Sequence, residues 1–226
     1  MARISMTEAE HTLITDAVAK AEAQTDGEIV TIVARRSDAY HDVGLHWAIL
    51  CAFLVFAAAA AWPDFFQSLY IRLLGGWQHE LPLNLFLLLL LCHAVVKFLA
   101  VRYLLAIPRL RMVFTPGATK HRRVRRRAVS LFRTAAEART VGRTGVLIYL
   151  SLDEHRAEII ADQGIAAAVE PSEWGEAMHA LLAEARGDRI GQGMAHAIER
   201  VGVVLARHLP KTDGGANELP DRLIEL

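Results

Sequence analysis

The sequence has few cysteines, the residues that cross-link many small domains, and its positive and negative charges are balanced. It contains two cysteines, Cys51 and Cys92, and no CxxC pair. We therefore expect neither a disulfide framework nor a cysteine metal site, and interpret both residues as small apolar side chains. The 25 Lys and Arg residues equal the 25 Asp and Glu residues in number. The charge of the whole chain therefore favours no class of partner.

Motifs of the common catalytic classes are also missing. Gly187, Gly191 and Gly193 do not form a phosphate loop, because no GxxxxGK[S/T] motif is present and the GxGxxG spacing does not fit. No serine occupies a nucleophile elbow, which argues against a serine hydrolase. Four histidines lack ligand spacing with a carboxylate on a shared face and are interpreted as surface residues: His155, His179, His196 and His208.

Long apolar runs set this sequence apart from an ordinary soluble chain. Its hydrophobic fraction is 53% and its mean hydropathy is +0.25, and the excess lies between Leu45 and Ile107. Runs at residues 45–62 and 81–106 are long enough to cross a hydrocarbon core of about 30 Å at roughly 1.5 Å per residue. A buried core helix is the alternative for either run. We expect two membrane spans in a hairpin of residues 39–108.

Residues near the ends of these runs fit the same interpretation. Trp47 and Trp62 lie near the ends of the first run, where amphipathic rings prefer the headgroup layer. Lys97 and Arg102 lie toward the end of the second run, where long cationic side chains can reach the interface. The aromatic segment between the runs, residues 63–80, is expected to lie along the membrane surface.

The charges that flank the hairpin predict its orientation. Arg35 and Arg36 precede the first span, and a cation-rich segment that begins at Arg109 follows the second. By the positive-inside rule, both termini face the cytoplasm and the protein is a multi-pass protein of the cytoplasmic (inner) membrane. The first 18 residues lack an apolar region and a cleavage site, so no signal peptide is expected.

A basic run, "KHRRVRRR", lies just after the second span. We expect it to face anionic lipid headgroups, because cations close to an anionic leaflet are each stabilised by about 1 kcal/mol. Its position argues against a nucleic-acid partner, and a protein-docking face is the remaining alternative. The expected lipid-facing cluster consists of Arg122, Arg123, Arg125, Arg126 and Arg127.

The polar parts of the chain have the pattern of one α/β domain. Thr7 and Glu10 have capping-box spacing before a helix that ends at the Asp26-Gly27 break. Further helices are expected over residues 122–139, 172–187 and 190–209, the first with Val129, Leu131, Phe132 and Ala136 on its apolar side. Apolar runs predict strands at residues 28–34, 145–151 and 156–162. The tail, residues 211–226, is expected to be disordered.

The order of these elements predicts a three-layer α/β sandwich with a small mixed sheet, interrupted by the two-helix transmembrane hairpin. The first two strands pair in parallel through a crossover, and the third returns as a hairpin. Residues 1–38 and 109–210 are then two parts of one domain. They can share a core only if both lie on the same side of the membrane, as the charge rule also requires.

Three segments carry a resemblance to a known family: "TEAEHTLITDAVAKAEAQTDGEIVTIV", "RTGVLIYLSLDEHRAEIIADQGI" and "EWGEAMHALLAEARGDRIGQGMAHAIERVGVVLARHLP". Together they resemble a TPM domain over nearly all of the polar part of the chain. The resemblance implies an α/β sandwich. Members of the family are commonly membrane-tethered and are linked to acid-phosphatase-like activity and to the upkeep of membrane complexes.

Carboxylates are expected at both edges of the sheet. Asp153 and Glu154 lie in the turn after the second strand, while Asp26 and Asp162 fall at the opposite edge. Oxygen-rich edges of this kind can bind Ca²⁺ or Mg²⁺. TPM domains commonly have an acidic or amide residue just before the glycine that starts the second strand, where this sequence has Arg143-Thr144.

The alternative to a metal site is a structural role for the same residues. Arg143 then forms an ion pair with Asp162, Gly145 starts the strand, and Gly164 turns the chain toward the next helix. Two functions stay open. The first is a non-enzymatic module that binds or maintains another membrane protein, and the second is a weak metal-dependent phosphatase near the membrane. No cofactor is certain.

Overall fold

The computed structural model describes residues 6–76, 80–134, 144–185, 187, 189–212 and 221–226. The chain divides into two compact units. The first, which we call the α/β unit, consists of Met1–Asp38 and Gly117–Leu226. The second, the helical insert, is Ala39–Pro116. The α/β unit is therefore built from two chain segments that the insert separates.

The sheet of the α/β unit has the strand order β3-β2-β1-β4. Strands β1 (Glu28–Ala34) and β2 (Gly145–Ser151) pair in parallel over their full lengths, and β3 (Arg156–Ala161) pairs antiparallel with β2. Every residue of β1 and β2 is buried, as expected for strands that helices cover on both faces. The predicted parallel pair and the predicted hairpin are both confirmed.

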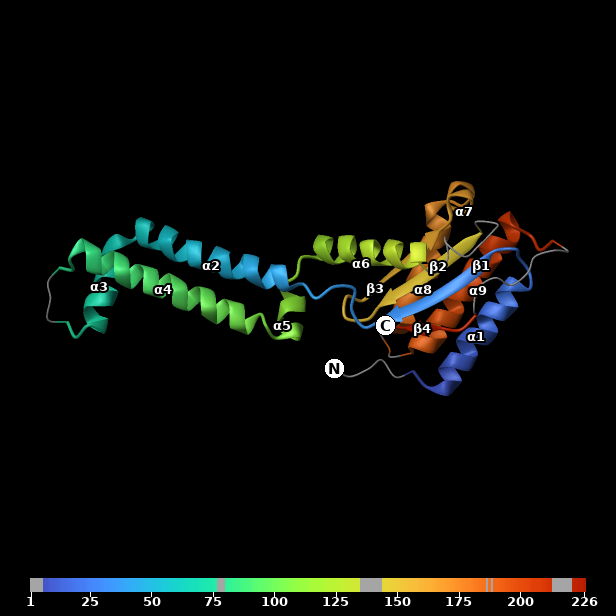
Figure 1. Cartoon of the computed structure of the whole chain (residues 1–226), viewed down its shortest axis with the longest axis horizontal. Coiled ribbons are helices and arrows are strands. Elements are labelled where there is room, and N and C mark those ends of the chain that lie inside the picture. Colours follow the sequence, from blue (N-terminus) through green and yellow to red (C-terminus); the bar gives the residue numbers. More distant parts are fainter. Residues whose placement is uncertain (1–5, 77–79, 135–143, 186, 188, 213–220) are drawn as a thin grey trace. The chain divides into compact units, whose positions relative to one another are not determined.

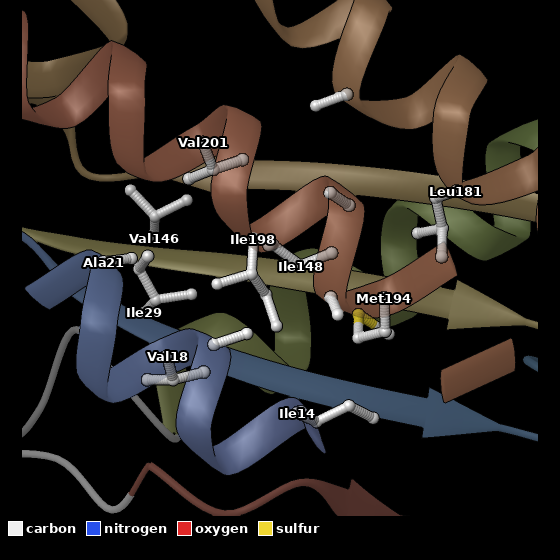
Figure 2. Close-up of a cluster of buried hydrophobic side chains, with 14 of the residues drawn as sticks. Ile14, Val18, Ala21, Ile29, Val146, Ile148, Leu181, Met194, Ile198 and Val201 are labelled. Carbon is white, nitrogen blue, oxygen red and sulfur yellow. The ribbon is translucent and has the colours of Figure 1, made fainter. Parts of the chain in front are cut away.

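Helices cover the sheet on two faces, so the predicted three-layer sandwich is confirmed (Figure 1). On one face, α6 (Gly117–Phe132) packs Val124, Ala128 and Phe132 against side chains of β1 and β2 that include Leu147 and Tyr149. On the other face lie α1 (Glu8–Glu22), α8 (Pro171–Ala185) and α9 (Ile190–His208). Figure 2 shows apolar side chains of α1 and α9 directed toward each other and toward the strands.

Local sequence explains how the helices on this second face begin and how closely they pack. Thr7 caps α1 in the predicted capping box with Glu10. A Cβ atom at Gly191 would lie 2.7 Å from Cγ of Glu10, and one at Gly202 would lie 2.7 Å from Cβ of Ala21. Both glycines belong to α9, so small residues allow α9 to approach α1 closely.

The structure corrects three expectations for the α/β unit. The end of the tail is not disordered, because Ile224–Glu225 forms β4 in parallel with β1. Val129 does not belong to the packed face of α6, which Val124 and Ala128 occupy instead, while Ala136 lies outside the described residues. Gly164 is not a turn residue, because it lies within α7 (Gln163–Ala168) and does not have a positive φ.

The helical insert contains α2 (His41–Ala61), α3 (Pro63–Leu73), α4 (Leu83–Leu104) and α5 (Pro108–Val113). Helices α2 and α4 lie side by side (Figure 1). Gly44 and Ala48 of α2 are buried, and a Cβ atom at Gly44 would lie 3.4 Å from Cβ of Leu105. Small residues of this kind let two apolar helices pack closely. By length and composition, α2 and α4 could each cross a membrane.

Helix α3 packs on the other two long helices of the insert. Its Phe66 and Tyr70 are buried among residues of α2 and α4 that include Val55 and Leu90. The Tyr70 hydroxyl lies 3.1 Å from Nδ1 of His93. Pro63–Leu73, the first part of the segment between the two apolar runs, is therefore an amphipathic helix with one face packed on α2 and α4.

Candidate functional site

The carboxyl ends of β1 and β2 lie side by side at one edge of the sheet, and the helical insert follows β1 in the chain. After β2, the turn at residues 152–155 contacts the segment that follows β1. The backbone N–H of Leu152 donates to the Ala34 carbonyl at 3.0 Å, and the N–H of Asp153 donates to the Arg35 carbonyl at 2.9 Å. His155 completes the turn with a φ of 49°. The turn is thereby fixed against the last residues before the insert.

Glu154 lies at the centre of a buried hydrogen-bond network in this turn. It is 5% exposed, and its Oε1 accepts a hydrogen bond from the Ser37 backbone N–H at 2.9 Å. The Ser151 hydroxyl donates to Oε2 of Glu154. The Ser37 hydroxyl lies 3.0 Å from Oγ of Ser151 and 2.9 Å from the Tyr149 hydroxyl. Burial raises the pKa of Tyr149. The network ties the chain just before the insert to β2.

Ion pairs reinforce the same edge. Nε and Nη2 of Arg36 lie 2.8 and 2.6 Å from Oδ2 of Asp153. Nη1 of Arg123, on α6, lies 3.0 Å from Oδ2 of Asp38. The structure thus brings Asp153 and Glu154 to the expected edge, and Asp38 follows β1 there. Arginine and hydroxyl partners engage their oxygens there.

A second set of charged contacts joins α6 to β3. Glu158 is 6% exposed, and its carboxylate lies 3.3 Å from His121 and 3.5 Å from Arg125. Burial raises the pKa of Glu158, although the neighbouring cations act in the opposite direction. Nη2 of Arg156 donates to the carbonyl of Gly117 at 3.4 Å, where the chain returns from the insert. Gly117, the first residue of the second chain segment of the α/β unit, is therefore held beside β3.

The opposite edge of the sheet contains Asp162. Its Oδ2 accepts a hydrogen bond from the Gly145 N–H at 3.0 Å, and its own N–H donates to the Gly145 carbonyl at 3.0 Å. Asp162 is 6% exposed and is the N-cap residue of α7. Arg143 lies outside the described residues, so its ion pair with Asp162 stays a prediction. The observed contacts give Asp162 and Gly145 the role of closing the ends of β2 and β3.

Asp26 has partners of a different kind. Both of its carboxylate oxygens accept hydrogen bonds from Thr212, from the backbone N–H at 3.1 Å and from the hydroxyl at 2.5 Å. Nζ of Lys211 lies 4.0 Å from Oδ1. The hydrogen bonds from Thr212 lower the pKa of Asp26. Asp26 therefore holds the segment after α9 against the loop before β1.

Sequence reasoning missed a buried carboxylate near this edge. Glu22 is 7% exposed, and its Oε1 accepts a hydrogen bond from the Ile29 N–H at 2.7 Å. Burial raises the pKa of Glu22 to about 8, and the negative charge of Glu28 acts in the same direction. A signal was present in the sequence, because Glu22 follows the buried Ile14 and Val18 at four-residue spacing. The carboxylate occupies a core position of α1.

The predicted metal ligands lack the further oxygen and nitrogen ligands that a metal site needs among the described residues. Within the ranges that the structure describes, no three His, Cys, Asp or Glu side chains form a group that could hold a metal ion. Ca²⁺ needs six to eight oxygen ligands, and Mg²⁺ needs near-octahedral geometry. The described residues around Asp26, Asp162, Asp153 and Glu154 do not fit that requirement. We therefore derive no metal-dependent step from them.

A cavity lies beside the carboxyl end of β2, between the sheet and helices α8 and α9. Its volume is about 90 Å³, and Leu150, His155, Leu182 and Ile190 contribute to its lining. Ligand pockets are usually about 300–1,000 Å³ in volume. This cavity is therefore too small to hold a drug-sized substrate.

Comparisons with known proteins agree with this fold. The NMR structure of the BA42 protein from the psychrophilic bacterium Bizionia argentinensis sp. nov. is similar, with a TM-score of 0.56, 18% sequence identity and coverage of 100% of both chains. At this identity the likeness shows the fold alone. No curated protein matches the chain. Residues 108–204 match the family model of the TPM domain. The match covers less than half of the chain, and it identifies residues 108–204 as a TPM domain.

Proposed function

We propose that this protein is a membrane-anchored TPM-domain protein whose α/β unit faces the cytoplasm and binds, or helps to maintain, another membrane protein without catalysing a reaction. The observation that carries the proposal is the pair of long apolar helices inserted into one folded unit. Both connections of the insert leave and enter the α/β unit, at Asp38 and Gly117. An anchor of this kind attaches the TPM domain to a membrane at two points of the chain.

Exposed apolar side chains on α2 and α4 support the anchor. Phe53 and Leu54 on α2 are 66% and 56% exposed, and Leu83 and Val96 on α4 are 71% and 62% exposed. Apolar surface of this extent is unfavourable in water and favourable in hydrocarbon. The helices measure roughly 30 Å at 1.5 Å per residue, which is the thickness of a bilayer core.

The cytoplasmic orientation rests on the flanking charges. Arg35 and Arg36 precede α2, while Arg109 and Arg111 follow α4. The segment between α2 and α4 contains Asp64, Arg72, His79 and Glu80, so it has no cationic excess. The positive-inside rule then keeps both connections, and with them the α/β unit, on the cytoplasmic side.

The contacts of the predicted site residues support a binding module over a phosphatase. Asp153 pairs with Arg36, Glu154 accepts from Ser37 and Ser151, and Asp162 accepts from Gly145. These contacts fix strand ends and the start of the insert. They give each carboxylate a structural role that needs no metal ion.

Two measurements on the full chain test the proposal. After expression in bacterial cells, the chain should stay in the membrane pellet through carbonate extraction, and release into the soluble fraction would contradict the anchor. In detergent, Ca²⁺ or Mg²⁺ should leave Tm unchanged, since a bound ligand at a hundredfold excess over its Kd adds about 2.7 kcal/mol. Metal-dependent hydrolysis of p-nitrophenyl phosphate that Asp162→Asn abolishes would instead establish the phosphatase.

A further inference from the structure

Helix α6 divides its cations between two faces. Three of them are directed at acidic groups of the α/β unit. Arg123, whose side chain is 16% exposed, pairs with Asp38, while Arg125 and His121 lie beside the buried carboxylate of Glu158. Together with Val124, Ala128 and Phe132, these contacts fasten the helix to the sheet. The basic run is therefore not one uniform surface.

The outer face of α6 has a different composition. A groove of about 560 Å³ lies along it, and no acidic residue contributes to its described lining. The lining consists of Arg122, Arg126, Val129, Ser130, Arg133 and Thr134, together with Arg125, which also lies beside Glu158. Arg122 and Arg126 are exposed and are separated by one helical turn. Within the described ranges, no carboxylate pairs with either of them. Two exposed arginines on successive turns thus line the groove, and an apolar residue, Val129, lies on the next turn.

We infer that this groove binds the phosphate groups of anionic lipids, with Arg122 and Arg126 as the principal ligands. Guanidinium groups present planar pairs of N–H donors that match phosphate oxygens. Val129 adds an apolar contact suited to the glycerol and upper acyl region of a lipid. The inference rests on the proposed anchor and specifies the lipid class that the α/β unit contacts.

The chain length between α4 and α6 favours a lipid over a soluble phosphate compound as the occupant. Helix α4 ends at Leu104 and α6 begins at Gly117, so 13 positions separate them (117 − 104). Even a fully extended chain reaches at most about 3.3–3.6 Å per residue, and the helix α5 within this stretch shortens it further. If α4 crosses the membrane, the groove is tethered within a few nanometres of its surface. Lipid phosphates are then present at high local concentration.

The test uses the full chain in nanodiscs of phosphatidylcholine, with or without phosphatidylglycerol. We expect phosphatidylglycerol to raise the Tm of the wild-type chain, because a ligand that binds the folded state stabilises it. The double variant Arg122→Gln/Arg126→Gln should lose most of this rise. The matched control is Arg200→Gln/Arg207→Gln, which removes the same charge from α9, where these arginines pair with Glu176 and Glu173. It should keep the rise.

A further variant separates the two faces of α6. Arg123→Gln should lower Tm in both kinds of disc, because Asp38 loses its partner, and should keep the rise that phosphatidylglycerol causes. Equal Tm values for the wild-type chain in the two discs would overturn the inference, and so would equal losses in the two double variants. An equal rise with inorganic phosphate or duplex DNA in phosphatidylcholine discs would also overturn it. Failure of the chain to enter any disc would instead contradict the proposed anchor itself.

Discussion

Helices α9 and α4 have similar lengths and are both rich in apolar residues, yet they bury very different fractions of their residues. Helix α9 buries ten of its 19 residues, whereas α4 buries two of its 22. Most apolar residues of α9 are buried on one side, and its exposed residues include Glu199 and Arg200. Those of α4 lie all around the helix. The comparison separates a helix that is apolar on one face from a helix that is apolar throughout.

This difference indicates the environment that each helix requires. The buried face of α9 is covered by α1, α8 and the sheet, so the α/β unit supplies its own apolar environment (Figure 2). Helix α4 leaves Leu87, Leu88 and Leu91 more than half exposed, at 52%, 55% and 52%. A bilayer would supply the missing environment. The same substitution should therefore have different consequences in the two helices.

The largest effect is expected where the core is complete. Ile198 is 0% exposed in α9, and Ile198→Ala should lower the free energy of unfolding of the α/β unit by about 2–5 kcal/mol, because it leaves a cavity in a packed core. Leu88→Ala in α4 should change that free energy by less than about 0.5 kcal/mol. Denaturant unfolding of the full chain in detergent measures both. Equal losses would remove the distinction between the two helices.

Substitution of the buried Glu154 should also destabilise the α/β unit. Glu154→Leu removes both accepting oxygens, so the Ser37 N–H and the Ser151 hydroxyl lose this acceptor. The expected loss is about 1–3 kcal/mol, the cost of a buried group left without a partner. Thermal unfolding at neutral pH measures the loss. Glu176→Leu, at an exposed ion pair on α8, is the control and should have little effect. A Glu154 variant as stable as wild type would show that the network is not structural.

The pH dependence of stability should come partly from Glu22. Its folded pKa of about 8 is raised above the ordinary 4.5, so the folded state binds the proton more tightly than the unfolded state. The contribution of Glu22 to stability is then fully present below the ordinary pKa and is lost as pH rises toward about 8. Glu22→Gln keeps an oxygen for the Ile29 N–H and stays neutral, so it should flatten this decline. Unfolding midpoints from about pH 5 to about pH 9 test the slope, and an unchanged slope would contradict the assignment.

The smallest effect is expected for a charge within the hairpin. Lys97 is exposed in α4, toward the end that precedes the basic segment. Lys97→Leu should leave membrane insertion unchanged, because a cation near a helix end is tolerated rather than required. Carbonate extraction and normal protein levels check this result. Loss of the proposed partner binding at normal protein levels would instead place Lys97 in a functional site within the membrane.

Sequence patterns predicted the central strands because these strands have uninterrupted apolar character. β1 and β2 need cover on both faces, and the helical segments around them supply it. β4 could not be predicted, because Ile224–Glu225 is too short to show a pattern in a polar tail. Its pairing depends on the free edge of β1, which exists only in the folded unit. The capping box of Thr7 and Glu10 could be predicted because its two residues lie only three positions apart in the sequence.

The site residues were less predictable than the strands. Asp153 and Glu154 were correctly expected at the carboxyl edge of the sheet, but their partners Arg36 and Ser37 come from a segment more than 100 positions away. Contacts at that separation leave no periodic signal. For α6, the spacing of Val124, Ala128 and Phe132 was present in the sequence, yet the arginines around these residues obscured which face is packed. The two roles of those arginines became clear only from their acidic partners.

The most direct test of the anchor is the accessibility of single cysteines in intact bacterial cells. In a Cys51→Ser/Cys92→Ser background, Glu80→Cys marks the segment before α4, and Lys20→Cys marks an exposed position of α1 in the α/β unit. With a membrane-impermeant maleimide, the account predicts that Glu80→Cys is labelled in intact cells and that Lys20→Cys is labelled only after lysis. Labelling of Lys20→Cys in intact cells, or of neither position before lysis, would contradict a hairpin that spans the membrane with the α/β unit inside.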